Sequence, residues 1–271
     1  MMKLGISTYA FRWEIDEMEP GLETILHFVR KTKELGGEVF QICDHPPIEY
    51  LEEEELLQVK EAADNEGIEL EAGTQGITPD HIRKYIHIAR VLGAKTLRTM
   101  VHSKEAHPSM AEAKEWLKDV VPELEEHGVK IALETYEPIK TRDLVDIVEE
   151  VGSPHIGICL DPGNSISELE FPRDVIDQGT AYATNVHLKD FVFQRKDKSI
   201  GFDLIGAPVG EGQLDVAYLL ESLQKEDIQV NAIVELWLPF QDSVQETIDV
   251  EDEWMERSLK NMKKALNREH V

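Results

Sequence analysis

Cysteine is scarce in this chain. Its 271 residues hold two cysteines, Cys43 and Cys159, and both fall in segments predicted as strands. Two cysteines do not make the disulfide framework of a small secreted domain, so we expect a protein of the reducing cytoplasm. No signal-peptide pattern precedes the first predicted strand, which agrees with that expectation.

Positive charge and long apolar runs are also scarce. Lys and Arg number 28 against 54 Asp and Glu, giving a formal net charge of −26. Such an acidic surface repels phosphate backbones, so nucleic acid is excluded as a partner. No apolar run approaches the ~20 residues of a membrane helix, so no membrane partner is expected. Hydrophobic residues still make up 41% of the chain, enough for a large core, which excludes a disordered protein.

A glycine-rich phosphate loop is absent after the first predicted strand, where residues 6–9 read Ile-Ser-Thr-Tyr. This disfavours an open dinucleotide-binding sheet. Strand and helix patterns instead alternate along the whole chain. Strands are predicted at residues 3–8, 39–43, 68–72, 96–101, 130–134, 156–161, 183–189 and 230–236. Helices are predicted between them, the last at 250–266, and residues 191–212 are expected to be a long connection. The alternation predicts an α/β fold, a (β/α)8 TIM barrel, formed by residues 1–271 as a single domain.

Four predicted strands carry a charged or metal-binding side chain near their ends. Three apolar runs stop at Glu134, Asp161 and Glu235, and the seventh strand carries His187. Because the strand ends of a barrel meet at one mouth, we predict that these four residues bind one divalent metal ion. The alternative, four unrelated residues in surface loops, is disfavoured because charged groups rarely follow buried strands without a partner. Three carboxylates and one imidazole favour Mn²⁺, with Mg²⁺, Co²⁺ or Zn²⁺ as alternatives.

Around these residues the chain resembles the sugar isomerase/epimerase superfamily of xylose isomerase-like TIM barrels. The resemblance covers nearly the whole chain. It rests on Leu-Glu at 133–134, Leu-Asp-Pro-Gly-Asn at 160–164, Val-His-Leu-Lys-Asp at 186–190, Pro-Val-Gly-Glu-Gly at 208–212 and Val-Glu at 234–235. It implies that Glu134, Asp161, His187 and Glu235 hold the metal, and that Glu134 and Glu235 also exchange protons with a carbohydrate substrate. It further implies a homodimer or a homotetramer.

The chain departs from this superfamily at two positions. Many members have a histidine where this chain has Asn164, and asparagine can donate a hydrogen bond but cannot carry a proton near neutral pH. The ketose epimerases have an arginine where this chain has Phe193, and the nearest arginine here is Arg195. The asparagine keeps related lyase reactions open, and the arginine contact is either lost or moved.

The main functional prediction is a metal-dependent isomerase or epimerase of a small polyhydroxy ketone or keto acid. The metal would stabilise an enediolate, and Glu134 and Glu235 would be the acid and base. The alternative is a lyase at the same site, either a 3-oxo sugar acid decarboxylase or an inosose- or dehydroshikimate-type dehydratase. A non-catalytic sugar-binding barrel is disfavoured because binding alone needs no proton donors on two faces. An endonuclease is excluded by the charge of the chain and by the single histidine among the four residues.

Further residues are candidates for substrate binding because they lie near predicted strand ends. They are Asn164, Lys189, Gln41, Arg98, Trp13, Trp237 and Arg195. Trp13 and Trp237 would wall a sugar-sized pocket. Arg195 belongs to a basic cluster with Lys196 and Lys198, which would bind a carboxylate or phosphate or would simply be a solvated loop.

Overall fold

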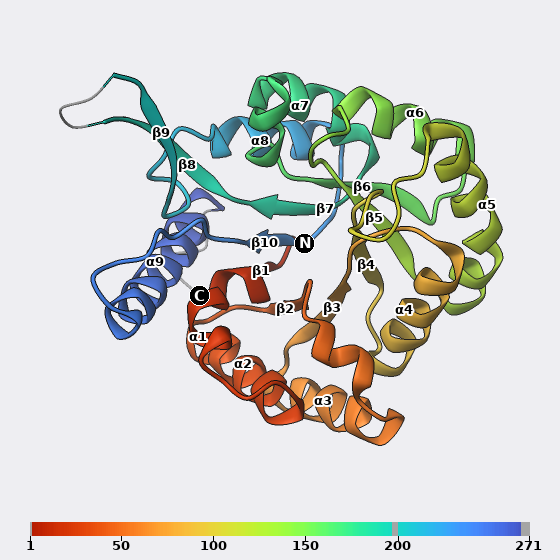
Figure 1. Cartoon of the computed structure of the whole chain (residues 1–271), viewed down its shortest axis with the longest axis horizontal. Coiled ribbons are helices and arrows are strands. Elements are labelled where there is room, and N and C mark those ends of the chain that lie inside the picture. The colour runs from red at the N-terminus through yellow and green to blue at the C-terminus, as the bar shows by residue number, and fades with distance from the viewer. Residues whose placement is uncertain (1, 197–199, 267–271) are drawn as a thin grey trace.

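The computed structural model describes residues 2–196 and 200–266. Within these residues eight parallel strands close into a barrel in the order β1-β10-β7-β6-β5-β4-β3-β2 (Figure 1). The barrel strands are β1 (Leu4–Ser7), β2 (Val39–Ile42), β3 (Glu69–Gly73), β4 (Thr96–Thr99), β5 (Lys130–Glu134), β6 (Ile156–Leu160), β7 (Ala183–Leu188) and β10 (Ala232–Val234). The predicted TIM barrel is confirmed.

Helices form the outer ring around the barrel (Figure 1). They are α1 (Arg12–Asp16), α2 (Leu22–Glu34), α3 (Glu53–Glu66), α4 (Pro79–Leu92), α5 (Met110–His127), α6 (Thr141–Val151), α7 (Pro172–Gly179), α8 (Val216–Lys225) and α9 (Val244–Ala265). Short 3-10 turns lie at Thr8–Phe11, Pro46–Tyr50, Asn164–Glu168 and Thr180–Tyr182. The apolar residues of α2 recur every three or four positions, so one stripe of the helix packs on the strands. Glycine ends α3 in the left-handed conformation, at Gly67 with φ 68°, which reverses the chain towards β3.

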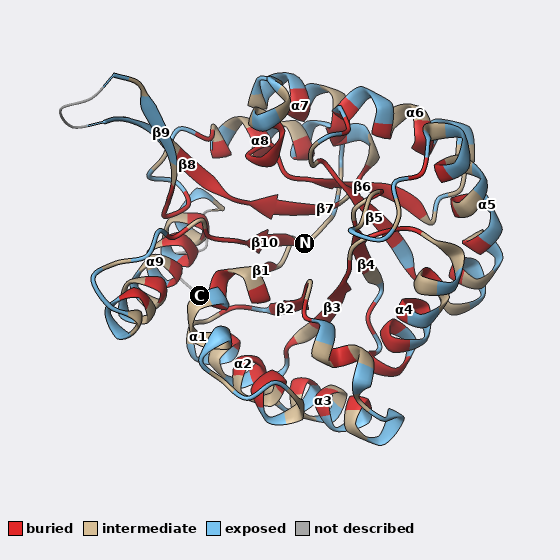
Figure 2. Cartoon of the chain, in the orientation of Figure 1, coloured by how far each residue is buried: buried red, intermediate tan, exposed pale blue. Residues whose placement is uncertain are grey.

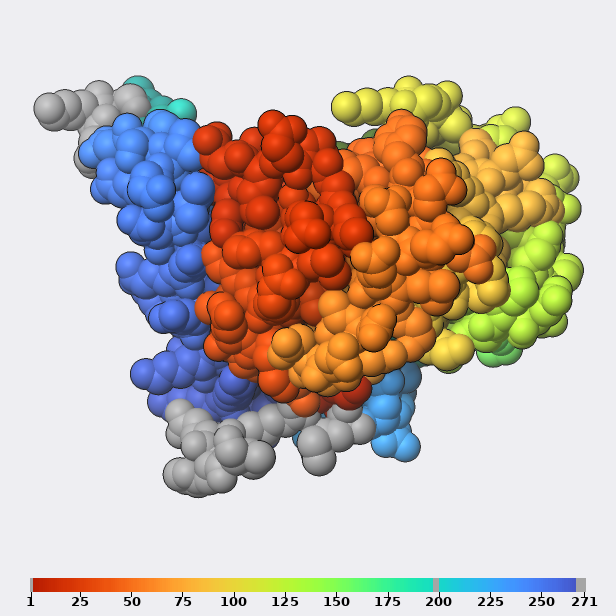
Figure 3. All heavy atoms as spheres, turned by 90° about the horizontal axis from the view of Figure 1, so that it is seen from below, coloured from red at the N-terminus to blue at the C-terminus, as the bar shows by residue number. Residues whose placement is uncertain are grey.

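The core lies between the strands and the inward helix faces, as the burial colours of Figure 2 show. Polar side chains are buried as well, and several of them belong to the strands or follow them directly. In the side view of Figure 3, α9, drawn in blue, runs along one side of the molecule from top to bottom. Across the described ranges, no helix is both long and apolar enough to cross a bilayer.

The expected long connection at residues 191–212 was wrong in part. The segment contains an antiparallel hairpin of β8 (Asp190–Arg195) and β9 (Phe202–Ala207), which projects from the barrel (Figure 1). Its strands alternate apolar and polar residues only briefly, next to the charged sequence at 195–198, so the pattern resembled a loop. Lys198 of the predicted basic cluster lies outside the described residues. The last helix begins at Val244 and not at 250, because the Ser243 hydroxyl accepts a hydrogen bond from the backbone N–H of Glu246.

Candidate metal centre

The four predicted metal ligands meet at the carboxyl ends of four neighbouring strands. Glu134 ends β5, Asp161 follows β6, His187 lies in β7 and Glu235 follows β10. All four are buried, and one potential ligand atom from each lies within 4.8 Å of the others. The spacing along the sequence, about one strand-helix unit between the first three, therefore corresponds to proximity in the barrel mouth.

One oxygen of each carboxylate is anchored by a neighbour. Glu134 Oε1 accepts a hydrogen bond from Asn164 Nδ2 at 2.6 Å. Glu235 Oε1 accepts one from Ser7 Oγ at 2.8 Å. Asp161 Oδ1 accepts the backbone N–H groups of residues 163 and 164 at 3.0 and 3.2 Å. Each carboxylate is therefore held in one orientation.

Four buried atoms of the cluster are not satisfied by hydrogen bonds. Glu134 Oε2, Asp161 Oδ2, Glu235 Oε2 and His187 Nδ1 are all buried and lack a hydrogen bond of normal geometry. These four atoms are one from each predicted ligand. Three oxygens and one imidazole nitrogen form a donor set that suits a divalent cation, so the residues fit the metal that the sequence predicts.

Two cationic side chains approach the same oxygens as ion pairs. Lys189 Nζ lies 3.0 Å from Asp161 Oδ2 and 2.7 Å from Glu235 Oε2. The guanidinium of Arg98 contacts Glu134 Oε2 and lies 3.0 Å from Asp44 Oδ1. Both cations are buried, so their charges act at low effective dielectric.

These charges set the protonation of the cluster. Burial alone would raise the pKa of Glu134, but the charges of Arg98 and His187 outweigh it and hold the pKa below its usual range. At Glu235, burial raises the pKa, but the charges of His187 and Lys189 outweigh burial and hold the pKa well below its usual value. Burial raises the pKa of Asp161 to about 6, against the opposing charge of Lys189. The carboxylates of Glu134 and Glu235 are therefore ionised near neutral pH, as metal ligands must be.

Asn164 and Lys189, two of the predicted substrate-binding residues, lie at this centre. Lys189 Nζ donates a hydrogen bond to Asn164 Oδ1 at 3.2 Å. The same ammonium lies 5.3 Å from the ring centroid of Trp237 and 5.8 Å from that of Tyr9. Trp237 is thus beside Lys189, as a wall of the site would be.

The other predicted substrate-binding residues make different contacts. Gln41 is fully buried behind His187 and accepts a hydrogen bond from its Nε2 at 2.8 Å. Trp13 Nε1 donates to the carbonyl of Leu238 at 3.1 Å, and its ring packs against a neighbouring phenylalanine. Arg195 is exposed on β8, and its guanidinium stacks on Phe202 at 4.6 Å.

Sequence reasoning missed Ser7 and Asp44. Ser7 ends β1 and donates a hydrogen bond to Glu235. Asp44 follows β2 and accepts hydrogen bonds from Arg98, from Tyr9 Oη at 3.1 Å and from Gln75 Nε2 at 2.9 Å. Asp44 lies near the end of a predicted strand, as Asp161 does, and that position could have indicated a residue of the site. Ser7 offered none, because a serine at a strand end is common.

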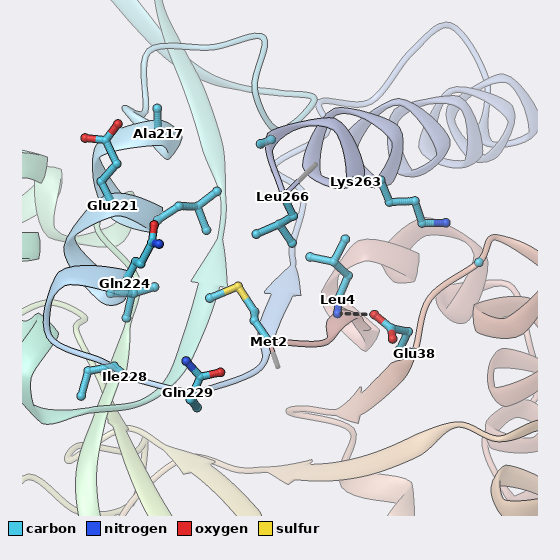
Figure 4. A pocket seen from close by; sticks show the side chains of 14 residues that line it. Met2, Leu4, Glu38, Ala217, Glu221, Gln224, Ile228, Gln229, Lys263 and Leu266 are labelled. Atoms are coloured by element: carbon cyan, nitrogen blue, oxygen red, sulfur yellow. Dashed lines mark hydrogen bonds between the residues drawn. The ribbon is translucent and has the colours of Figure 1, made fainter. Parts of the chain in front are cut away.

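A cavity of about 420 Å³ opens beside Glu134. Its lining includes Gln75, His102, Lys104 and Tyr136, which come from the loops that follow barrel strands. A larger cavity, of about 950 Å³, lies among residues that precede the strands, at the opposite end of the barrel (Figure 4). Its lining is mainly apolar and contains none of the four predicted ligands.

The fold and the cluster define a (β/α)8 barrel with a candidate metal centre at the carboxyl ends of its strands. Residues 29–265 match the model of the xylose isomerase-like TIM barrel family, and the chain belongs to that family. It is 40% identical over 258 residues to a 3-oxo-isoapionate decarboxylase of Pectobacterium atrosepticum, an alignment that covers 95% of this chain and 94% of that protein.

Solved structures support the fold. A D-psicose 3-epimerase crystallised in the presence of D-fructose has a TM-score of 0.74 and 16% identity, covering 98% of this chain and 99% of that one. The IOLI protein with a bound zinc atom has a TM-score of 0.71 and 20% identity, with coverage of 98% and 99%. At these identities the likeness concerns the fold alone.

Proposed function

We propose that this protein is a divalent-metal-dependent lyase that removes CO₂ from a 3-oxo sugar acid. The observation that carries the proposal is its 40% identity, across 95% of the chain, to a 3-oxo-isoapionate decarboxylase. Among the alternatives predicted from the sequence, this relation favours decarboxylation over proton exchange. A metal ion held by the four clustered residues would supply the chemistry that this reaction needs.

Glu134, Asp161, His187 and Glu235 are the residues that would hold the metal. A divalent cation bound there would act as a Lewis acid for negative charge that develops on the 3-oxo oxygen. In the reaction the bond between C1 and C2 breaks, its electron pair forms the enolate across C2 and C3, and C1 leaves as CO₂. C2 then takes up one proton.

Decarboxylation does not require a base that removes a proton from carbon. Glu134 and Glu235 can therefore act as ligands only, which suits their anchoring by Asn164 and Ser7. Asn164, which replaces the histidine of many relatives, can orient an oxygen by hydrogen bonding but cannot move a proton. These features are compatible with a reaction in which no carbon acid is ionised.

Lys189 is the side chain best placed to bind the substrate carboxylate and to supply the final proton. Its ammonium is held at the centre, near Asp161 and Glu235, beside the ring of Trp237. The charges of these carboxylates overcome the effect of burial and raise the pKa of Lys189 well above its usual range, so it carries a proton at neutral pH.

The second candidate is the isomerase or epimerase. It is favoured by the presence of two glutamates, Glu134 and Glu235, at one centre, since proton removal and return can use one on each face. The product of isomerisation or epimerisation has the same mass as its substrate, whereas the product of decarboxylation is lighter by the mass of CO₂.

Proton NMR in D₂O separates the two candidates. Mg²⁺-loaded protein should convert 3-oxo-isoapionate to a product that lacks the carboxylate and carries one solvent deuteron at C2, faster than the uncatalysed control. Lys189→Met should lower kcat by roughly 10²–10⁴-fold, the range for general acid catalysis. Deuterium exchange into ketoses with no acceleration of CO₂ loss from 3-oxo acids would favour the isomerase and contradict the lyase.

A further inference from the structure

A group of buried polar side chains lies behind His187, inside the barrel. Gln41 of β2, Glu71 of β3 and Asn185 of β7 are 0%, 1% and 0% exposed. Gln41 and Glu71 are paired in register across neighbouring strands. Glu71 and Asn185 are not among the predicted ligands or substrate-binding residues, and a buried carboxylate in a barrel interior requires a reason.

Glu71 acts only as a hydrogen-bond acceptor in this group. Its Oε2 accepts from Asn185 Nδ2 at 2.9 Å and from Gln41 Nε2 at 3.0 Å. Its Oε1 accepts from Asn231 Nδ2 at 2.8 Å. Both oxygens thus face amide NH₂ groups, which is the arrangement of an ionised carboxylate.

The carboxylate determines which way the Gln41 amide points. Gln41 Nε2 donates to Glu71 Oε2 and to Asn185 Oδ1, the latter at 3.1 Å. The reversed amide would place Oε1 against two acceptors, so it is strongly disfavoured. Gln41 Oε1 must then face the opposite side, where His187 Nε2 lies at 2.8 Å.

The orientation of Gln41 in turn determines the tautomer of His187. An amide oxygen can only accept, so the proton of a neutral imidazole must reside on Nε2. Nδ1 then carries the free lone pair. This atom faces the carboxylates, 3.3 Å from Glu235 Oε1 and 3.6 Å from Glu134 Oε1.

We propose that Glu71, acting through Gln41, is a positioning residue that fixes the tautomer and ring orientation in which His187 Nδ1 binds a divalent cation. The proposal rests on the proposed metal site and is independent of which reaction the site performs. Partners of metal-ligating histidines typically contribute 10–100-fold to metal affinity. We expect a contribution of that size from Gln41, and a smaller one from Glu71, which acts one hydrogen bond further away.

The test measures the dissociation constant of Zn²⁺ by competition with a chromophoric chelator, for wild-type protein and for Gln41→Leu. The leucine removes the acceptor, and the constant should rise by roughly 10–100-fold. Thr99→Val is the matched control, because it removes a buried strand hydroxyl that donates to the carbonyl of residue 76 at 2.8 Å. Its affinity should equal that of the wild type. Thermal unfolding of the metal-free variants shows whether each one folds.

Glu71→Gln keeps the shape and serves as the second variant if Gln41→Leu does not fold. A glutamine at position 71 presents both an oxygen and an NH₂ group. It therefore no longer fixes the orientation of the Gln41 amide, and metal affinity should fall. The visible absorption of the Co²⁺-substituted protein should also change in both variants, since it reports the ligand geometry. If the wild type binds metal and both variants keep its affinity and its spectrum, the proposal is overturned. A wild type that binds no metal would instead overturn the metal site on which it rests.

Discussion

Replacing Arg98 by methionine should destabilise the metal-free protein about twice as much as the metal-bound one. Arg98 pairs with Glu134 and with Asp44, and the side chains of the three are 3%, 0% and 9% exposed. It also donates to the carbonyl of residue 74 at 3.0 Å. Methionine keeps much of the aliphatic volume but leaves two buried carboxylates without their shared counterion.

The magnitude follows from the cost of an unpaired buried charge. Removing one partner of a buried ion pair typically costs about 3–5 kcal/mol. A loss of that size should lower Tm by roughly 6–20 °C in a protein of this size. A bound divalent cation compensates the charge of Glu134, so the loss in metal-loaded protein should be about half as large, because Asp44 alone then lacks its partner.

The assay is thermal unfolding of wild type and Arg98→Met, each stripped of metal and then saturated with Mn²⁺. The matched control is Arg173→Met, which removes an exposed pair with Asp215 in which the side chains are 54% and 35% exposed. Surface pairs of this kind are worth about 0–1 kcal/mol. Equal Tm losses in the two variants, or a loss in Arg98→Met that metal does not reduce, would refute the reasoning.

Three further predictions concern the metal ligands and one distant carboxyl group. Glu134→Gln and Glu235→Gln should each lower CO₂ release mainly by weakening metal binding, so excess Mn²⁺ should restore part of kcat, as steady-state assays across Mn²⁺ concentrations will measure. Asp161→Asn and His187→Ala should lose bound metal outright, measured as metal content per chain, while circular dichroism stays that of the wild type. Glu251 accepts the backbone N–H groups of residues 13 and 14, and burial raises its pKa from the ordinary 4.5 to about 7. Between those pH values the folded chain keeps a proton that the unfolded chain has lost. The free energy of unfolding should therefore fall by about 3 kcal/mol as pH rises through this window. Urea unfolding should show that Glu251→Gln removes this dependence on pH.

Each of these outcomes has a clear opposite. A loss of about 10²-fold or more in a glutamine variant that excess Mn²⁺ does not reduce would identify that glutamate as a proton acceptor and favour the isomerase. Full metal content in His187→Ala would remove the histidine from the ligand set. An identical slope of stability against pH in wild type and Glu251→Gln would show that this carboxyl group titrates normally.

The barrel and its four clustered residues were predictable from local patterns. Apolar runs of strand length alternate with helical periodicity, and the runs before Glu134, Asp161 and Glu235 each stop at a carboxylate. In a parallel barrel, such positions necessarily meet at one mouth. Fold and proximity therefore follow from features that are each contained within about 30 residues, one strand-helix unit.

The polar interior of the barrel was not predictable in the same way. Gln41 and Asn185 are 144 residues apart, and their hydrogen bond depends on which strands face each other across the closed barrel. Gln41 was predicted to bind substrate, and only the structure shows that it lies behind His187. The β8–β9 hairpin was missed because two short strands beside a charged stretch of sequence carry too little periodicity to be distinguished from a loop.

The central claim is that a cation held by Glu134, Asp161, His187 and Glu235 is required for decarboxylation of a 3-oxo sugar acid. The most direct measurement is mass spectrometry of ¹³CO₂ released from 3-oxo-isoapionate labelled at C1, by protein as purified, stripped of metal, and restored with Mn²⁺. We predict that release above the uncatalysed rate stops on metal removal and returns with Mn²⁺. Release that persists in fully stripped protein, or its absence from the Mn²⁺-loaded protein, would contradict the account.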